Sequence, residues 1–387
     1  MAVRASKKAS AQPTLHIPGV EDAEIQPALG LYQILAPDGS LVVPESEVPK
    51  LSPAQLLDMY RAVVRIRTMD ERLLGLQRQG RIGFYGEARG QEASIIGAAY
   101  ALGREDIIVP ALREAGAALL HGLPLLAYVA QIFGNANDLA KGRQLPCHPG
   151  SRESRYVTMS SCVGSQLPHA QGMAWAAKIR GDKTVVMGFM GDGATSEEDF
   201  HVAMNFAGVF EVPVVFVCEN NQWAISTPVT AQTASPTIAI KAVAYGIPGV
   251  RVDGNDILAV YKVAKAAVDR ARAGGGPTFI EALTYRIGAH SSSDDPSRYR
   301  DEAITEAWKD KDPIARLRSY LLGRKALDEA ADARLHEAAD AEVREAIAAE
   351  EGVPPPALAT LVEDVYAEVP AHLAEQLADL ERVRRGS

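Results

Sequence analysis

The sequence predicts an α/β fold of the doubly wound kind, in which helices cover both faces of a mostly parallel sheet. Short apolar runs rich in β-branched residues alternate with segments of helical periodicity. Two of these runs, residues 184–190 and 212–218, each lead into a polar turn, Gly191-Asp192-Gly193 and Asn220-Asn221. The twenty-six residues from 194 to 219 that separate the turns suit one strand-helix-strand crossover. A chain of 387 residues is long enough to bury the core of such a sheet.

Residues 1–51 are expected to form an N-terminal arm that is partly disordered. Proline and glycine recur in it, and Pro-Asp-Gly-Ser at 37–40 predicts a turn between short extended pieces. The first twenty residues contain Arg4, Lys7 and Lys8 but no acidic residue, as a mitochondrial presequence does. A disordered arm on a cytoplasmic protein explains the same residues, and we favour that interpretation.

Regular structure is expected from Ser52-Pro53 onward, where a capping serine and a proline open a long helix. Gly80 can end this helix. Its apolar face consists of Leu56, Tyr60, Val63, Ile66, Leu73 and Leu76.

Further helices are predicted at 90–103 and 113–134, with a short apolar run at 107–109 between them. The last clear strand covers residues 278–283. Residues 52–310 are therefore expected to form the sheet domain.

Residues 311–387 are charged and rich in alanine, and they predict a C-terminal helical region. We expect these helices to pack on the sheet domain or on a partner chain, although a solvated helical tail is an alternative. The helical stretches are 313–322, 327–350 and 357–383, with a break at 352–356.

The composition argues against several classes of protein and partner. With 47% hydrophobic and 23% charged residues the chain is typical of a globular protein. A net charge of −9 argues against a nucleic-acid surface, and no apolar run is long enough to predict a membrane span. The three cysteines, Cys147, Cys162 and Cys218, form no CxxC pair, so neither a disulfide framework nor a zinc site is indicated. A reducing cytoplasm is the simplest location.

The two polar turns predict a site for a metal-bound diphosphate. The carboxyl ends of neighbouring parallel strands lie at one edge of a sheet, so Asp192 and Asn221 can meet there. One carboxylate and one amide oxygen, completed by phosphate oxygens, suit Mg²⁺. Ser196, followed three residues later by Asp199, is expected to cap a helix whose free N–H groups attract phosphate. Asp-Gly alone is a common turn dipeptide, so the spacing and the Asn-Asn pair carry the prediction.

From Arg65 to the C-terminus the chain resembles the alpha subunit of the branched-chain 2-oxo acid dehydrogenase decarboxylating component, with the pyruvate dehydrogenase alpha subunit as a close relative. Besides the two turns, the matching pieces are RQGRIGFY (78–85), LREAG (112–116), GNANDLAKGRQLPCH (134–148), SSCVGSQLPHAQG (160–172), VDGND (252–256) and YRIGAHSSSDDPSRYR (285–300). The resemblance implies the thiamine diphosphate-binding fold and a cofactor shared with a beta subunit. It further implies an α2β2 heterotetramer and a complex with a lipoyl-bearing acyltransferase core.

The same resemblance implies roles for individual residues. Magnesium would be bound by Asp192, Asn221 and the carbonyl of Trp223. Thiamine diphosphate would contact Arg113, Ser161, Val163, Gly191, Gly193, Ala194 and His290. A possible K⁺ site would consist of Ser160, Cys162, Ser165 and Gln166. The aromatic pair Phe84 and Tyr85 is a candidate wall of the acyl pocket, although core packing explains it equally well.

The resemblance places His290 at the position of the family's active-site loop histidine, which makes it the catalytic candidate, and the pKa of histidine suits proton transfer near neutral pH. Without the resemblance, a lone histidine in a polar loop would be read as solvated. His148 and His169 lie near the cofactor segments and are expected to be structural, and Cys147 to be inert. Ser291 matches a kinase site of animal relatives.

Two residues depart from the family pattern. Leu112 replaces a cofactor-contacting tyrosine, and Glu219 replaces a diphosphate-binding arginine. A carboxylate at position 219 would repel a diphosphate unless it points away.

The function expected from these residues is oxidative decarboxylation of a branched-chain 2-oxo acid with transfer of the acyl group to a lipoyl group. Pyruvate is the alternative substrate. Two other readings stay open. The glycines at 191–193 partly match a dinucleotide fingerprint, which would suggest an NAD-dependent dehydrogenase, although the third glycine is missing. A noncatalytic assembly subunit would explain the acidic C-terminal helices but not the metal-site spacing.

Overall fold

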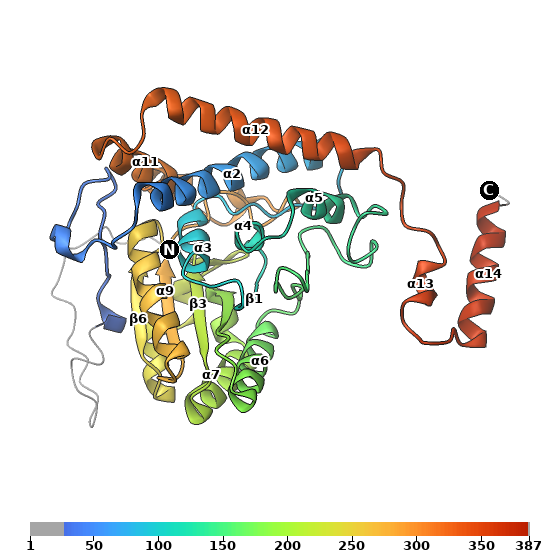
Figure 1. Cartoon of the computed structure of the whole chain (residues 1–387), viewed down its shortest axis with the longest axis horizontal. Coiled ribbons are helices and arrows are strands. Elements are labelled where there is room, and N and C mark those ends of the chain that lie inside the picture. Colours follow the sequence, from blue (N-terminus) through green and yellow to red (C-terminus); the bar gives the residue numbers. More distant parts are fainter. Residues whose placement is uncertain (1–26, 386–387) are drawn as a thin grey trace.

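The computed structural model describes residues 27–385, and its centre is a five-stranded parallel sheet (Figure 1). The strands are β1 (Ile107–Val109), β2 (Val186–Gly191), β3 (Val214–Asn220), β6 (Gly249–Asp253) and β7 (Thr278–Leu283). Their order across the sheet is β1-β2-β3-β7-β6, and every neighbouring pair is parallel. The predicted doubly wound α/β fold is thus confirmed.

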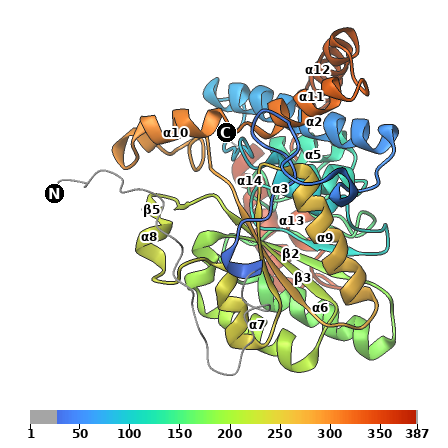
Figure 2. The same ribbon diagram turned by 90° about the vertical axis from the view of Figure 1, so that its left-hand side faces the viewer.

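Helices cover both faces of this sheet (Figure 2). One face packs against α6 (Gln166–Arg180) and α7 (Glu198–Phe210), and the other packs against α3 (Glu92–Ala99) and α9 (Ile257–Arg272). Successive strand residues belong to opposite cores, as Val186 and Met187 of β2 do. The strands therefore read as continuous apolar runs because both of their faces are buried.

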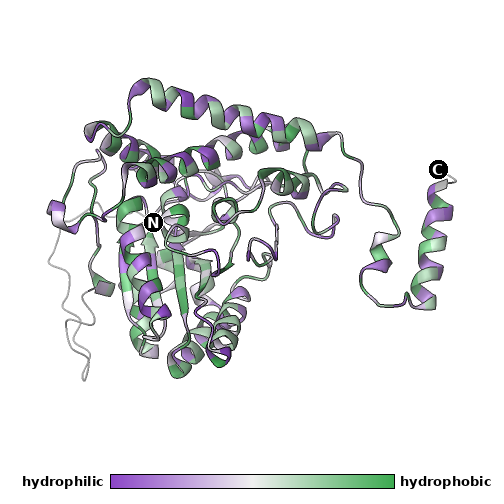
Figure 3. Ribbon diagram, viewed as in Figure 1, coloured by the Kyte–Doolittle hydropathy of each residue, from purple (hydrophilic) through white to green (hydrophobic). Residues whose placement is uncertain are grey.

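The long helix α2 (Pro53–Arg78) begins where the sequence predicts. Ser52 accepts the backbone N–H of Gln55, whose side chain in turn accepts the N–H of Ser52. The helices α11 (Pro313–Gly323) and α12 (Glu329–Glu351) pack on α2 and share its core. Apolar and polar residues alternate along α12 (Figure 3), as expected for a helix that lies on a surface.

Three predicted helices are interrupted. Residues 90–103 form only the eight-residue α3, and 113–134 divide into α4 (Ala115–Leu120) and α5 (Leu125–Phe133). The interruption contains Gly122, with φ of +101°, and Pro124, which precedes α5. The last helical stretch divides into α13 (Thr360–Glu363) and α14 (Ala371–Arg385), which extend away from the body (Figure 1).

The N-terminal segment covers the sheet edge at β6. The backbone N–H of Tyr32 donates to the carbonyl of Arg251 at 2.9 Å, and Tyr32 forms a parallel bridge with Val252. The carboxylate of Asp256 accepts the N–H groups of Ile34 and Leu35 at 2.7 and 2.6 Å. This part of the expected arm is therefore ordered, and it pairs an edge strand that would otherwise be open. The presequence-like first twenty residues lie outside the described residues.

The remaining short elements connect these layers, and several border the site. None of the helices between residues 27 and 385 has both the length and the apolar character needed to cross a bilayer. The short elements are η1 (Glu45–Glu47), η2 (Asp192–Ser196), β4 (Trp223–Ala224), β5 (Thr227–Pro228), α8 (Val229–Gln232), η3 (Ala239–Tyr245), η4 (Pro296–Arg298) and α10 (Glu302–Lys309).

Candidate active site

The two predicted turns lie side by side at the carboxyl edge of the sheet. β2 and β3 are neighbours, with Gly191 in register with Glu219, so Asp192 and Asn221 follow the ends of adjacent strands. Both residues line one cavity of about 460 Å³. The topology thus brings together the two groups on which the predicted metal site depends.

Asp192 is buried, yet one of its carboxylate oxygens has no partner. Oδ2 accepts the side-chain amide of Gln232 at 2.7 Å, whereas Oδ1 has no hydrogen bond in the described structure. Burial raises the pKa of Asp192, and the hydrogen bond from Gln232 and the charge of Arg286 offset this effect only in part. A buried carboxylate oxygen without a hydrogen-bond partner is suited to bind a metal ion.

The helix after this turn begins later than predicted. Residues 192–196 form the 3₁₀ helix η2, and α7 begins at Glu198 with no side-chain cap. Ser196 is exposed, and its hydroxyl is 3.4 Å from the carbonyl of Gln232. The expected capping by Ser196 is therefore wrong, because η2 has displaced the first turn of the α-helix.

Asn221 and Trp223 lie in one tight turn after β3. The side-chain oxygen of Asn221 accepts the N–H of Trp223 at 3.1 Å, and its amide donates to Gln91 at 2.9 Å. The carbonyl of Trp223 accepts Nη1 of Arg286 at 3.2 Å. A carbonyl oxygen has two lone pairs, so this bond leaves one for a metal. Gln91, Gln232 and Arg286 were not singled out from the sequence, since only tertiary contact places them here.

Arg113 lies between the cavity and the loop that carries His290. Its guanidinium donates to the backbone carbonyl of Glu87 and, at 2.7 Å, to that of His290. Nη2 also lies 3.4 Å from Nδ1 of His290. Arginine can only donate, so Nδ1 faces it with a lone pair and the neutral ring carries its hydrogen on Nε2.

His290 is neutral at neutral pH. Burial, followed by the positive charges of Arg113 and Arg286, lowers the pKa of His290 to about 4. Asp294 accepts the backbone N–H of His290 at 2.7 Å and so shapes the loop. The arrangement presents an uncharged imidazole, able to donate one hydrogen bond, at the cavity wall.

The segment 160–166 supplies another wall of the cavity. Ser160, Ser161, Val163 and Gln166 line it, and Val163 is 60% exposed. Cys162 and Ser165 do not line it, but the hydroxyl of Ser165 donates to the carbonyl of Cys162 at 2.8 Å and lies 3.0 Å from the hydroxyl of Ser160. The amide of Gln166 donates to the carbonyl of Phe189. The oxygens expected around K⁺ are therefore clustered beside the cavity.

Gly191, Gly193 and Ala194 line the cavity as well, and position 193 requires glycine. A Cβ at Gly193 would lie 2.7 Å from that of Ala224. The close approach of β4 therefore excludes a side chain at this point of the turn.

Glu219, which replaces an arginine of the family pattern, is buried against Ser94 and Glu114. Ser94 donates to it at 2.5 Å, and the two carboxyl groups are hydrogen-bonded to each other. Burial and the neighbouring Glu114 raise the pKa of Glu219 well above its usual range. A pair that shares a proton carries one charge fewer than two carboxylates, which reduces the expected repulsion of a diphosphate. Leu112, the second departure, lines the cavity.

Phe84 and Tyr85 line two different cavities. Phe84 lines the cavity of Asp192, whereas Tyr85 does not. The ring of Tyr85 is fully buried, and its hydroxyl donates to Asp70 at 2.7 Å. These contacts of Tyr85 agree with the alternative explanation, core packing. Among the other candidates, His148 lines the cavity, His169 is exposed outside it, and Cys147 is buried.

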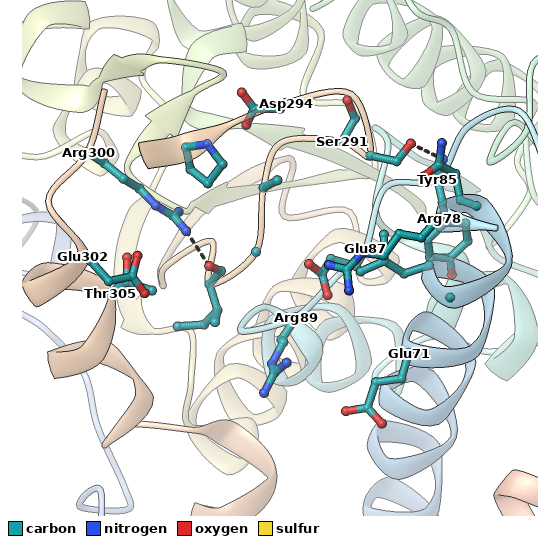
Figure 4. Close-up of a pocket in the computed structure, with 18 of the residues that line it drawn as sticks. Glu71, Arg78, Tyr85, Glu87, Arg89, Ser291, Asp294, Arg300, Glu302 and Thr305 are labelled. Carbon is teal, nitrogen blue, oxygen red and sulfur yellow. Dashed lines mark hydrogen bonds between the residues drawn. The ribbon is translucent and has the colours of Figure 1, made fainter. Parts of the chain in front are cut away.

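Tyr85 instead borders a second cavity of about 630 Å³ on the far side of the His290 loop. Figure 4 shows Arg300, Glu302 and Thr305 on one side of it and Glu71, Arg78, Glu87 and Arg89 on the other. Ser291 and Asp294 also line it. The loop that carries His290 thus separates a cavity of mixed charge from the cavity of Asp192.

The residues present fit a magnesium-bound diphosphate. Asp192 offers an unpartnered buried oxygen, Asn221 and Trp223 offer neutral oxygens, and Arg113 offers positive charge. The described part of the chain contains no group of three or more His, Cys, Asp or Glu residues suited to a metal. An ion at Asp192 would therefore depend on phosphate oxygens, as Mg²⁺ commonly does.

Comparison with known proteins decides the family. The family model "Dehydrogenase E1 component" matches residues 60–358. This chain belongs to the dehydrogenase E1 component family. It is 42% identical over 353 residues to the 2-oxoisovalerate dehydrogenase subunit alpha of Homo sapiens, a match that covers 91% of this chain and 79% of the relative.

Other E1 relatives agree with this assignment. The corresponding subunit of Mus musculus is 41% identical over 91% of this chain and 80% of the relative. That of Caenorhabditis elegans is 40% identical over 94% of this chain and 84% of the relative. The E1 family model includes both turns of the site and the loop of His290.

Proposed function

We propose that this chain is the alpha subunit of a thiamine diphosphate-dependent dehydrogenase that decarboxylates branched-chain 2-oxo acids and transfers the acyl group to a lipoyl-bearing acyltransferase. One observation carries the proposal. A buried carboxylate oxygen of Asp192 lacks a partner beside Asn221, at the sheet edge of a chain that is 42% identical to a 2-oxoisovalerate dehydrogenase alpha subunit.

Different residues would bind the metal ion, the diphosphate and the ring portion of the cofactor. Asp192, Asn221 and the carbonyl of Trp223 would hold Mg²⁺, and Arg113 would neutralise diphosphate oxygens. Gly191, Gly193 and Ala194 leave room for the diphosphate beside η2. Val163 would contact the ring portion of the cofactor. Ser160, Cys162, Ser165 and Gln166 would hold K⁺, whose role would be to stiffen the loop.

Thiamine diphosphate, once bound, supplies the electron sink that makes decarboxylation possible. The protein's part is to orient the acid, exclude water and manage protons. His290 contributes an uncharged imidazole with its hydrogen on Nε2. It would donate a hydrogen bond to a substrate oxygen that becomes negatively charged.

The cavity needs a second chain to be closed. Its rim exposes three apolar side chains, Leu145, Val163 and Ile225, at 62, 60 and 54%. Exposed apolar side chains gathered around a cavity are typical of a surface that a partner covers. A beta subunit in an α2β2 heterotetramer would close the site, and the acyltransferase core would receive the product.

The substrate can be tested directly. The chain, co-expressed with a beta chain, should bind thiamine diphosphate in the presence of Mg²⁺ and should not bind NAD, as measured by calorimetry. The reconstituted enzyme should show a higher kcat/KM for 3-methyl-2-oxobutanoate than for pyruvate. A much higher kcat/KM for pyruvate would assign it to the pyruvate branch, and NAD binding without thiamine diphosphate binding would overturn the proposal.

The names of the relatives bear on the cellular compartment of the protein. The alpha subunits of human, mouse and worm are all named as mitochondrial proteins. The cytoplasmic expectation has no support among these relatives, and the matrix alternative does.

A further inference from the structure

His148 connects a buried loop to a hydroxyl group that faces the cofactor cavity. The residue is only 4% exposed. Its Nδ1 lies 3.0 Å from the carbonyl oxygen of Pro146, and its Nε2 lies 2.7 Å from Oγ of Ser161. Ser161 itself is exposed and lines the cavity. The two ring nitrogens of His148 thus have one partner each.

The chemistry of these partners sets the direction of both hydrogen bonds. A carbonyl oxygen can only accept, so Nδ1 of His148 carries the hydrogen that reaches Pro146. An imidazole that carries its hydrogen on Nδ1 has a lone pair on Nε2, which lies against the hydroxyl of Ser161. Ser161 must donate its only hydrogen to that lone pair. Its oxygen therefore offers the cavity lone pairs alone.

The position of His148 is built into the fold. Gln131, a buried residue of α5, accepts the backbone N–H of His148 at 3.1 Å and donates to the carbonyl of Leu145 at 2.7 Å. Cys147, between them, has φ of +67°, so the chain turns sharply before His148. One buried amide thus clamps both sides of this turn and aims the imidazole at Ser161.

We propose that His148 is a positioning residue that fixes Ser161 as a hydrogen-bond acceptor for a donor group on the cofactor. This inference rests on the proposed use of thiamine diphosphate. The diphosphate of that cofactor offers only acceptors at neutral pH, whereas its exocyclic amino group is a donor. Ser161 therefore recognises the aminopyrimidine end and contributes nothing to diphosphate binding.

Two substitutions at position 148 separate the two hydrogen bonds. His148→Asn can keep the bond to Pro146, because its amide reaches the position of Nδ1, but it cannot reach Ser161. His148→Gln can place an amide oxygen near the position of Nε2 and keep Ser161 as a donor. The measurement is calorimetric binding of thiamine diphosphate with Mg²⁺ to the purified complex with its beta chain. A second titration uses the analogue that lacks the exocyclic amino group.

We expect His148→Asn and Ser161→Ala each to weaken thiamine diphosphate binding roughly three- to tenfold, the loss of one hydrogen bond. His148→Gln should bind nearly as wild type. Binding of the analogue should be unchanged in all three variants, and the double variant His148→Asn, Ser161→Ala should be no weaker than Ser161→Ala alone.

Three outcomes would overturn the inference: equal weakening by Asn and Gln, additive effects in the double variant, or equal weakening for the cofactor and the analogue. If His148→Asn does not fold, Ser161→Ala still decides, because it must weaken the cofactor and spare the analogue. Wild-type protein that binds no thiamine diphosphate would refute the proposed function, whereas binding with additive effects would refute only the role of His148.

Discussion

The guanidinium of Arg113 and the backbone of His290 are joined by a hydrogen bond of 2.7 Å, with the imidazole Nδ1 of His290 3.4 Å from the same nitrogen. One buried arginine therefore holds the loop of the candidate catalytic histidine while it faces the proposed diphosphate site. Cofactor binding and the position of His290 depend on the same side chain.

Arg113→Lys should weaken thiamine diphosphate binding about 10- to 100-fold. The single ammonium of lysine cannot replace a planar guanidinium that donates to the carbonyls of Glu87 and His290 and also faces the diphosphate. Calorimetry measures the affinity, and hydrogen exchange over residues 285–295 reports whether the loop has been released. Arg89→Lys is the matched control, since Arg89 lines only the cavities outside the cofactor site. Equal effects of the two variants would argue against the role assigned to Arg113.

Asp192→Ala should abolish Mg²⁺-dependent binding of thiamine diphosphate and leave the fold intact. Of the two oxygens that the variant removes, Oδ1 has no partner, and Gln232, the donor to Oδ2, keeps its hydrogen bond to the carbonyl of Thr227, so little stability is lost. Glu198→Ala, an exposed acidic residue of the same turn region, serves as the control. Circular dichroism and thermal melting check the fold, and undiminished cofactor binding would remove Asp192 from the metal site.

The histidine at position 290 should make the folded protein sensitive to mild acid. Its pKa is lowered from 6.5 to about 4, so between these values the unfolded chain binds a proton that the folded chain does not. This contribution to stability is present above pH 6.5 and is lost as the pH falls toward 4. Urea denaturation at about pH 7.5 and about pH 5 should show a larger loss for wild type than for His290→Gln.

His372→Gln provides the comparison for that experiment, because it removes an exposed imidazole. Its loss of stability on acidification should equal that of wild type. A His290→Gln variant that loses as much stability as wild type would show that the imidazole is not held neutral by its surroundings.

Asp256 should be a main determinant of how the N-terminal segment is held. One of its oxygens caps α9 through the N–H groups of Leu258 and Ala259, and the other accepts those of Ile34 and Leu35. Asp256→Ala should lower the free energy of unfolding by about 2–4 kcal/mol, since it removes a cap and leaves buried N–H groups unpaired.

Asp256→Asn separates the two functions of this carboxylate. Its remaining oxygen can cap α9, while its amide cannot accept from the arm. Limited proteolysis should then cut within residues 36–51 faster than in wild type, although α9 stays folded. Unchanged proteolysis in both variants would show that the arm is held by other contacts.

Some features follow from local sequence because the physics that decides them is local. The capping box at Ser52, the apolar face of α2 and the buried strands β2, β3 and β7 are properties of a few neighbouring residues. Helix ends were harder to place. The predicted helix 113–134 divides at Gly122 and Pro124, and Ser196 lies within η2 and does not cap α7. In both places tertiary packing outweighs small differences in local preference.

The sequence by itself determined that Asp192 and Asn221 meet. Adjacent parallel strands must present their carboxyl ends at one edge, and motif spacing identified the strands. Only the tertiary structure decided what surrounds these two residues: Gln232 beside Asp192, Gln91 beside Asn221 and Arg286 behind Trp223. It also turned Tyr85 toward Asp70 and His148 toward Ser161. Contacts between distant segments depend on how whole layers pack, and no local pattern of residues encodes that packing.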